Sequence, residues 1–264
     1  MDLDEKEIQL QRLLNTYPRL LIAYSGGVDS GFLLWFAAHR TLVQTTGILA
    51  DSPSLKRSEL REALEYAARH KLKVKTIQTE EMENPDYAAN PLNRCYYCKY
   101  TLFDQMNQIA EKERFDALCY GENADDANHD RPGRQAARDL TILAPLQQIG
   151  LSKQEIRELA AKYQLEIADK VAQPCLASRI PHGIAVTPER LQQVEKAEAY
   201  LTESGFKVVR VRHHDRKAVV QVSPTETARL LQPETTKSVK DHLINIGFET
   251  VEIDPIGYQG AGLK

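Results

Sequence analysis

Short apolar runs alternate with longer segments of helical spacing through the first two-thirds of the chain. The apolar runs predict strands at residues 20–24, 45–50, 73–79, 115–120 and 141–145. Apolar positions that recur every three or four residues predict helices at residues 30–39, 58–70, 97–111 and 152–165. Strands that alternate with such helices imply right-handed crossovers and a parallel sheet covered on both faces. The pattern therefore predicts an α/β fold for this part of the chain.

The pattern changes at residues 172–188, where prolines and a glycine interrupt it. The pattern of the remaining residues predicts a helix at residues 188–204 and a hairpin of two strands at residues 207–213 and 217–222. A second helix start follows at residues 223–226, and a closing strand at residues 248–253. This order indicates a small α+β domain after a linker. We therefore expect a parallel-sheet domain over residues 1–183 and an α+β domain, for substrate binding or oligomerisation, over residues 184–264.

The composition is that of an ordinary globular protein, with 42% hydrophobic and 27% charged residues among 264. A net charge of −3 supplies no basic field of the kind that binds nucleic acid, so a nucleic-acid partner is disfavoured. The acidic N-terminus does not resemble a signal peptide, and the longest apolar stretch, near residues 32–38, is too short to span a membrane. We expect a cytoplasmic protein without a membrane partner, its cysteines in a reducing compartment.

A glycine-rich turn, SGGVDS at residues 25–30, connects the first predicted strand to the first predicted helix. Gly26 and Gly27 let the backbone turn tightly, so that its N–H groups and the helix dipole face an anion. The Ser25 and Ser30 hydroxyls can donate to phosphate oxygens. Asp29 beside a polyphosphate requires a bridging Mg²⁺, or a role in orienting the backbone. The turn has neither the lysine of a Walker A loop nor the spacing of a dinucleotide fingerprint.

This string resembles the PP-loop of the adenine-nucleotide α-hydrolases, whose fold is HUP-like. The resemblance implies an ATP pyrophosphatase domain in which Ser25, Gly26, Gly27, Asp29 and Ser30 bind ATP together with Mg²⁺. Enzymes of this type cut ATP between the α and β phosphates and attach AMP to a carboxylate or carbonyl oxygen. A nucleophile, either ammonia or a sulfur species, then displaces AMP.

Three of the four cysteines lie in polar segments that we expect to be loops. Cys95 and Cys98 form C-x-x-C in NRCYYCK, and Cys175 lies in QPCLASR. Three thiolates can hold three irons of a [4Fe–4S] cluster and leave the fourth iron open for an extra sulfide. The alternatives are a structural zinc with His182 as fourth ligand, or a redox pair of Cys95 and Cys98. Cys119, in the apolar run ALCYG, is expected in the core.

The chain is similar to the LarE family, the ATP-dependent sulfur transferases that make the nickel-pincer cofactor of lactate racemase. The similarity spans nearly the whole chain and rests on AYSGGVDS, YGENADDANHDRPG, CLASRIPHG and VVRVRHH, at residues 23–30, 120–133, 175–183 and 208–214. It implies that a carboxylate of pyridinium-3,5-dicarboxylate mononucleotide is adenylylated and that sulfur then replaces its oxygen, giving a thiocarboxylate. LarE-like proteins are hexamers, so the resemblance also implies a homo-oligomer.

The resemblance leaves two sources for the sulfur. In one branch of the family, the cysteine that matches Cys175 donates its own sulfur and becomes dehydroalanine. This chain departs from that branch because it also carries Cys95 and Cys98, and its three cysteines resemble a branch in which sulfide on a [4Fe–4S] cluster is transferred. We therefore expect Cys175 to be catalytic and all three cysteines to bind the cluster, with sulfide or another sulfur donor as partner.

Further residues are candidates for binding the substrate. Arg210 and Arg212 alternate on a predicted strand and so share a face, while His213 points the other way. Two arginines on one face suit the phosphate of a mononucleotide; the alternative is a solvated strand face. Ser178 and Arg179 lie in the CLASR segment, where Arg179 is expected to hold the substrate carboxylate or the ATP phosphates. The alternative for Arg179 is a surface ion pair.

A charged loop follows the strand predicted at residues 115–120. Its residues are Asp125, Asp126, Asp130 and Arg131. Loops at the carboxyl ends of parallel strands surround the ligand site, and Gly121 would let the backbone approach the nucleotide; the alternative is a solvated acidic loop. Lys99 either aids phosphate binding or lies at the surface. Glu198 matches a family position linked to metal or substrate, although glutamates are common on helix surfaces.

Two other functions compete with sulfur transfer to a pyridinium mononucleotide. Some PP-loop tRNA thiolases also use three cysteines and a cluster, but the net charge and the lack of an evident RNA-binding module disfavour a tRNA substrate. The second is a nucleotide-binding iron–sulfur sensor without catalysis. It is disfavoured because nucleotide binding alone does not require the full S-G-G-x-D-S string.

Overall fold

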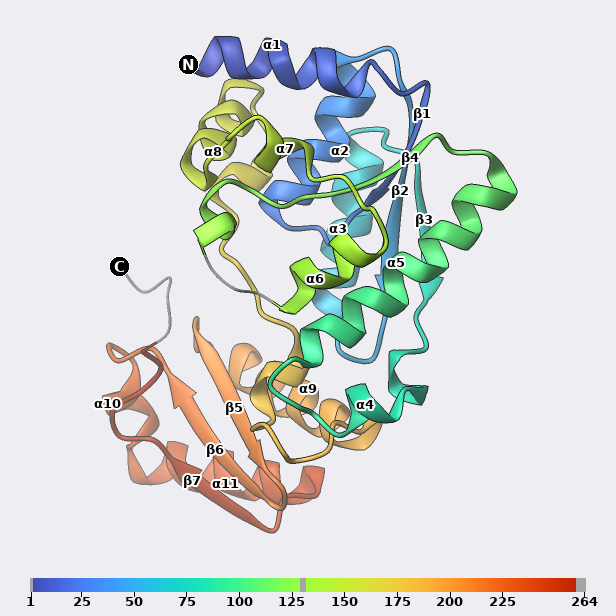
Figure 1. Ribbon diagram of the computed structural model, residues 1–264. Coiled ribbons are helices and arrows are strands. Elements are labelled where there is room, and N and C mark those ends of the chain that lie inside the picture. Colours follow the sequence, from blue (N-terminus) through green and yellow to red (C-terminus); the bar gives the residue numbers. More distant parts are fainter. Residues whose placement is uncertain (1, 129–131, 260–264) are drawn as a thin grey trace. The chain divides into compact units, whose positions relative to one another are not determined.

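The computed structural model describes residues 2–128 and 132–259, and Figure 1 shows the order of their helices and strands. The chain divides into two compact units. The N-terminal unit comprises Met1–Ser52, Arg57–Glu81 and Asn93–Ala172, and the C-terminal unit comprises Pro53–Lys56, Met82–Leu92 and Gln173–Lys264. Two short segments from the first half of the chain thus belong to the C-terminal unit. The domain boundary expected after residue 183 stays a prediction.

A four-stranded parallel sheet organises the N-terminal unit, in the order β3-β2-β1-β4. Its strands are β1 (Arg19–Ala23), β2 (Gln44–Asp51), β3 (Val74–Gln78) and β4 (Ala117–Tyr120). β1 lies in the middle, where Ala23 pairs with Ile48 of β2 on one side and Tyr120 of β4 on the other. The predicted α/β class and its parallel sheet are confirmed.

The strand predicted at residues 141–145 is wrong. Within the described residues, this segment contributes one parallel bridge, from Leu143 to Cys119. Pro145 then begins the short helix α7 (Pro145–Gln148). Proline has no N–H to donate to a sheet and is favoured at the first helical position, so it ends the extended stretch.

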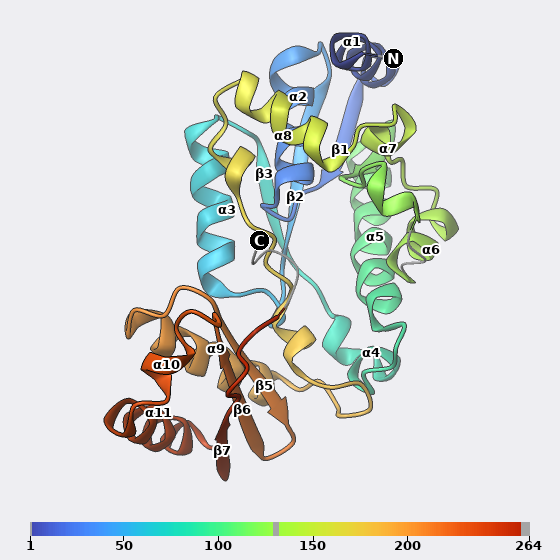
Figure 2. The same cartoon turned by 90° about the vertical axis from the view of Figure 1, so that its left-hand side faces the viewer.

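Helices cover both faces of the sheet. The N-terminal unit contains α1 (Leu3–Leu14), α2 (Val28–Arg40), α3 (Arg57–Arg69), α5 (Arg94–Glu113), α6 (Pro132–Asp139), α7 and α8 (Lys153–Lys162), with the 3-10 turns η2 (Asp125–Asn128) and η3 (Glu166–Asp169). The 3-10 turn η1 (Glu81–Glu83) has its first residue in this unit and the other two in the C-terminal unit. α2 and α3 lie on one face and α5 on the other (Figure 2). No helix among the described residues is long and apolar enough to cross a membrane.

Local sequence explains two helices that shape the site. α2 buries Phe32, Leu33 and Phe36 and packs against both β2 and α8. α8 opens with the predicted capping box, in which the Ser152 side chain accepts from the Glu155 N–H and the Glu155 side chain accepts from the Ser152 N–H. Such a cap contributes about 1 kcal/mol and fixes where the helix begins.

The C-terminal unit is a three-stranded sheet packed against helices. β5 (Val209–His214) and β6 (Lys217–Val222) form the predicted antiparallel hairpin, and β7 (Thr250–Ile253) joins β6 in parallel. The helices are α4 (Pro85–Ala88), α9 (Pro188–Glu203), α10 (Thr227–Leu230) and α11 (Pro233–Ile246), with the 3-10 turn η4 (Leu176–Arg179). Val211, Val220 and Leu243 are fully buried in its core.

Candidate functional site

The SGGVDS turn joins β1 to α2 as predicted, and its own polar groups order it. The Ser25 N–H donates to the Ser30 Oγ at 3.1 Å, and the two hydroxyl oxygens lie 2.9 Å apart. Gly27 is the N-cap of α2, and no side chain in the described part of the chain caps this helix. The N–H groups of the first turn can therefore bind an anion at the positive end of the helix dipole.

Two glycines let neighbouring elements approach this turn closely. Gly26 has φ 73°, and a Cβ there would lie 2.6 Å from the Ala63 Cβ on α3. A Cβ on Gly121, directly after β4, would lie 2.6 Å from the Ser30 nitrogen. Both positions thus require glycine for the packing of the phosphate loop itself. The approach of Gly121 to a nucleotide stays a prediction.

Asp29 pairs with a lysine that the sequence analysis missed. The Lys153 Nζ, at the first residue of α8, lies 2.9 and 2.8 Å from the two Asp29 carboxylate oxygens, and the Asn123 Nδ2 donates to Asp29 at 3.3 Å. The charge of Asp29 is balanced by this pair, which explains how an acid fits into a phosphate loop. Lys153 lies 124 residues from Asp29 along the chain, so no local sequence pattern links the two.

Side chains of the loop after β4 order that loop. The Asn123 Oδ1 accepts from the N–H groups of Asp125 and Asp126 at 2.9 and 3.2 Å. The Asp125 Oδ2 accepts from the Lys153 N–H at 2.8 Å and so ties the loop to the start of α8. Such local bonds hold a turn without a ligand. The other two charged residues predicted for this loop lie outside the described residues: Asp130 and Arg131.

Cys95 and Cys98 lie in the first two turns of α5. The loop expected at Cys95 is wrong, whereas Cys98 falls within the helix predicted at residues 97–111. The helix begins at Arg94 rather than at the predicted residue 97, and the side chain of its N-cap, Asn93, makes no capping hydrogen bond. At a spacing of i, i+3 the two side chains share one face of the helix. Cys95 is exposed and Cys98 is half-buried. Cys119 is fully buried as predicted, and burial raises the pKa of its thiol to about 12.

Lys99 follows the cysteine pair and is half-buried. Its Nζ lies 4.7 Å from the centre of the Tyr120 ring, and a Cβ on Gly133 would lie 2.6 Å from its Cδ. Burial lowers the pKa of Lys99, although the nearby Glu122 and Asp126 carboxylates act in the opposite direction. Lys99 therefore lies at the carboxyl end of β4, in the same unit as the phosphate loop. Its contact with phosphate stays a prediction.

Cys175 is exposed in the C-terminal unit, at the N-cap of η4. Arg179 binds the backbone around it: its Nη1 donates to the Pro174 carbonyl at 2.7 Å, the Cys175 carbonyl at 3.2 Å and the Ser178 Oγ at 2.9 Å. Arg179 is 1% exposed, so the alternative of a surface ion pair is wrong. Its direct contact with substrate or ATP stays a prediction, because these donors serve the cysteine segment.

Glu198, on α9, balances the charge of Arg179. It accepts from the Arg179 Nε at 2.8 Å and Nη2 at 3.1 Å, and it forms an ion pair with Lys56. It is 1% exposed, so the helix-surface alternative is wrong. Burial alone would raise the pKa of Glu198, but the hydrogen bond and charge of Arg179, together with Lys56, outweigh it and hold the pKa below its ordinary value.

Arg210 and Arg212 share one face of β5, while His213 is buried on the other, as predicted. The Arg210 guanidinium lies 4.8 Å from the centre of the Tyr258 ring. The Arg212 Nη1 donates to the Ser178 carbonyl at 3.0 Å, which places Arg212 beside the cysteine segment. In the described part of the chain, both guanidiniums bond to neutral oxygens rather than to carboxylates. Their charge is therefore available to an anionic ligand.

The candidate metal ligands are divided between the units, with Cys95 and Cys98 in one and Cys175 and His182 in the other. Among the described residues, no three His, Cys, Asp or Glu side chains group as a metal site. The His182 ring Nδ1 shares a hydrogen bond with the Asn90 carbonyl at 3.3 Å. The cluster, the zinc site and the redox pair all stay predictions.

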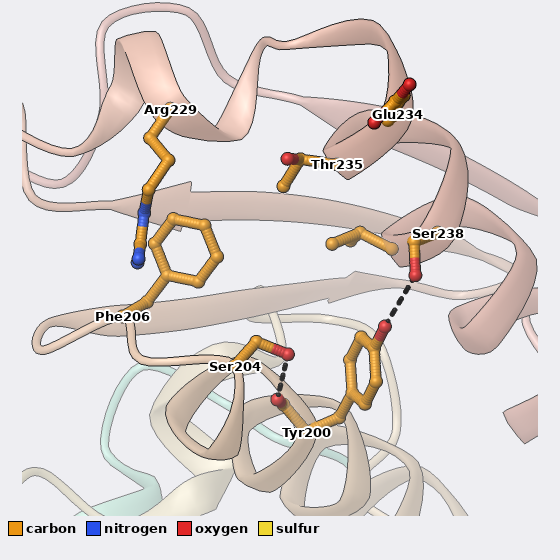
Figure 3. Close-up of a pocket in the computed structure, with 8 residues that line it drawn as sticks. Tyr200, Ser204, Phe206, Arg229, Glu234, Thr235 and Ser238 are labelled. Atoms are coloured by element: carbon orange, nitrogen blue, oxygen red, sulfur yellow. Dashed lines mark hydrogen bonds between the residues drawn. The ribbon is translucent and has the colours of Figure 1, made fainter.

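A cavity of about 350 Å³ lies apart from these residues, between α9, α10 and α11 (Figure 3). Some of its polar side chains bond to one another or to the backbone: the Tyr200 hydroxyl lies 2.8 Å from the Ser238 Oγ, and Arg229 donates to the Gly205 carbonyl at 2.9 Å. The residues that line it do not include those predicted for the site.

Comparison with known proteins identifies the family, although no family model matches the chain. An uncharacterized Synechocystis protein, slr1717, is 38% identical over 262 residues, covering 99% of this chain and 98% of its own. The pyridinium-3,5-bisthiocarboxylic acid mononucleotide synthase of Lactiplantibacillus plantarum is 28% identical over 260 residues, covering 98% and 94%. The chain belongs to the same family as slr1717. An uncharacterized protein of Methanocaldococcus jannaschii, MJ0830, is 28% identical over 238 residues, 89% of each chain.

The motifs that resemble the LarE family lie at the features just described. AYSGGVDS forms the turn between β1 and α2, and YGENADDANHDRPG begins at the end of β4 beside it. CLASRIPHG contains the exposed Cys175 and η4, and VVRVRHH contains β5 with its two arginines. These motifs therefore contain the SGGVDS turn in the N-terminal unit, and an exposed thiol with two arginines in the C-terminal unit.

Proposed function

We propose that this chain is an ATP-dependent, AMP-forming sulfur transferase that acts on pyridinium-3,5-dicarboxylate mononucleotide in nickel-pincer cofactor synthesis. The observation that carries the proposal is the exposed Cys175, on a segment bound by Arg212, in a LarE-like chain that also carries the phosphate loop. An exposed thiol on a segment that Arg212 also binds suits sulfur delivery to an anionic substrate. The homologue's name supplies the substrate class, and the residues of this chain supply the chemistry.

The first half-reaction uses the N-terminal unit. The loop N–H groups, with Ser25 and Ser30, hold the ATP phosphates, and Lys153 adds a cation beside them. The Asp29 carboxylate is an oxygen ligand of the kind that Mg²⁺ prefers, so the loop fits that ion. A substrate carboxylate oxygen bonds to the α-phosphorus, the bond to the β-phosphate oxygen breaks, and pyrophosphate leaves. Positioning and charge neutralisation supply most of the rate.

The second half-reaction uses the C-terminal unit. Arg210 and Arg212 bind the phosphate of the mononucleotide, and Ser178, whose carbonyl already accepts from Arg212, helps orient it. A sulfur nucleophile attacks the acyl carbon of the adenylate, and AMP leaves with the bonding electron pair. The product is a thiocarboxylate.

We propose that Cys95, Cys98 and Cys175 ligate a [4Fe–4S] cluster. Thiolate sulfur is the usual ligand of such clusters, and the exposed or half-buried positions of these cysteines fit that chemistry. When bound, the cluster supplies an open iron that carries sulfide for repeated turnover. The alternative is sacrifice of the Cys175 sulfur in a single turnover. Homo-hexameric assembly and a cytoplasmic location also stay predictions from the family.

The test is anaerobic purification followed by a pyrophosphate-release assay with ATP and the pyridinium substrate. We expect substrate-dependent pyrophosphate release and a brown protein with about four irons per chain. Cys95→Ser should lose iron, whereas Cys119→Ser, a matched change in the core, should keep it. Absence of pyrophosphate release would refute the proposed enzymatic activity. A colourless protein with one zinc would refute the proposed [4Fe–4S] cluster. Dehydroalanine at Cys175 after turnover would establish the sacrificial route.

A further inference from the structure

One buried carboxylate connects the thiol segment to the arginine strand. The Glu198 Oε1 accepts from the Arg179 Nε at 2.8 Å and from the Val211 N–H at 3.1 Å. The Glu198 Oε2 accepts from the Arg179 Nη2 at 3.1 Å and pairs with Lys56. All four donors lie in the C-terminal unit together with Glu198. The carboxylate therefore has hydrogen-bond donors on both oxygens.

The donors of Glu198 lead to two parts of the candidate sulfur site. Arg179 continues to the carbonyls of Pro174 and Cys175, so its orientation sets the backbone that carries the thiol. Val211 lies between the two arginines of β5, and its N–H points away from β6 toward Glu198 because β5 is an edge strand. A shift of Glu198 would therefore change the spacing between the thiol and the arginines.

Lys56 reaches this carboxylate from a separate segment of the chain. It comes from Pro53–Lys56, which follows β2 in sequence but belongs to the C-terminal unit. The Lys56 side chain is 20% exposed and that of Glu198 is 2% exposed. The same segment also binds the cysteine segment, since the Leu176 N–H donates to the Ser54 carbonyl at 2.8 Å. Residues 53–56 thus restrain the thiol segment directly, and also through Glu198 and Arg179.

We infer that Lys56 is a positioning residue for sulfur transfer, which holds Glu198 and Arg179 so that the Cys175 thiol keeps its place relative to the arginines of β5. This inference rests on the proposed function for its catalytic consequence only. Arg179 and Glu198 neutralise each other, so charge balance alone does not require a second cation. Lys56 restrains the Glu198 Oε2, and through it the geometry on which transfer depends.

The test compares Lys56→Met with Lys217→Met. Lys217 forms an exposed pair with Glu252 at 3.0 Å in the same unit and serves as the matched control. Hydrogen exchange of the peptide spanning residues 174–180 should rise about five-fold in Lys56→Met and stay unchanged in the control. The kcat for thiocarboxylate formation should fall about ten-fold, while the KM for ATP stays within about two-fold. Lys56→Arg should restore most of the wild-type kcat and most of the wild-type protection from hydrogen exchange.

The two readouts separate the inference from the proposed function. Wild-type protein that forms no thiocarboxylate would refute the proposed function, while the exchange comparison still decides the positioning role. Exchange and kcat of Lys56→Met equal to those of the control would overturn the inference. Pyrophosphate release that falls in parallel with thiocarboxylate formation would also overturn it, since Lys56 would then act on the ATP step. If Lys56→Met does not fold, Lys56→Gln carries the same comparison.

Discussion

Replacing Glu198 by glutamine is the sharpest perturbation of the C-terminal unit. The neutral amide can still accept from two donors, but its NH₂ group meets N–H donors of Arg179 or Lys56. Two cations are then left without their carboxylate, and the side chain of Arg179 is fully buried. Breaking a buried ion pair on one side costs about 3–5 kcal/mol, because the remaining charge is uncompensated. We therefore expect Glu198→Gln to destabilise this unit by about that amount.

The assay is local hydrogen exchange in peptides of α9 and β5, converted to a free energy of opening. The matched control is Glu252→Gln, whose exposed pair with Lys217 should contribute less than about 1 kcal/mol. The pKa of Glu198 is lowered in the folded protein, so its ionisation stabilises the fold above the ordinary carboxyl pKa. The difference from Glu198→Gln should therefore shrink as the pH falls through the folded pKa. A loss below about 1 kcal/mol at pH 7 would refute the reasoning.

Three further predictions concern individual contacts. Gly121→Ala should push its Cβ into the Ser30 backbone and lower the free energy of unfolding, measured in urea, by about 1–3 kcal/mol. It should also slow ATP-dependent pyrophosphate release. An unchanged stability and rate would contradict the close packing. Lys153→Met should remove the cation beside Asp29 and lower the rate of pyrophosphate release about 100-fold. Lys153→Arg should stay partly active. Full activity in Lys153→Met would contradict a role of Lys153 in binding the ATP phosphates. Burial lowers the pKa of His213 to about 4, so the free energy of unfolding of the wild type should rise with pH between about 4 and 6.5. His213→Gln should lose this pH dependence, measured by unfolding at a series of pH values. An unchanged slope of stability against pH in the variant would contradict the prediction.

Periodicity predicted the parallel sheet and the hairpin because both depend on runs of apolar residues, which are local signals. The strand predicted at residues 141–145 failed because Pro145 starts a helix instead. The early start of α5 escaped prediction although Asn93 is a preferred N-cap residue, because the polar and cysteine-containing segment NRCYYCK lacks the apolar spacing of a helix. These errors concern element boundaries, where the local signal is weakest.

Among the candidate site residues, those in one contiguous motif could be predicted from the sequence, whereas contacts between distant segments could not. The phosphate loop is a contiguous string, so it was found from the sequence alone. Lys153 pairs with Asp29 across 124 residues, and Lys56 reaches Glu198 from another segment, so neither pairing leaves a local pattern. Arg179 illustrates a harder case. An arginine at this position suggested an anion site. In the structure, Arg179 is buried and its N–H groups donate to the cysteine segment and to Glu198. A single sequence does not show that burial.

The central claim is that ATP cleavage at the SGGVDS loop drives sulfur transfer to a pyridinium carboxylate. The most direct measurement is a single-turnover reaction with ATP, Mg²⁺, sulfide and pyridinium-3,5-dicarboxylate mononucleotide, in which pyrophosphate, AMP and thiocarboxylate are quantified together. We expect equal amounts of the three products in the wild type, and pyrophosphate release without thiocarboxylate in Cys175→Ala. Thiocarboxylate formed without AMP, or AMP formed equally well without the pyridinium substrate, would contradict the central claim.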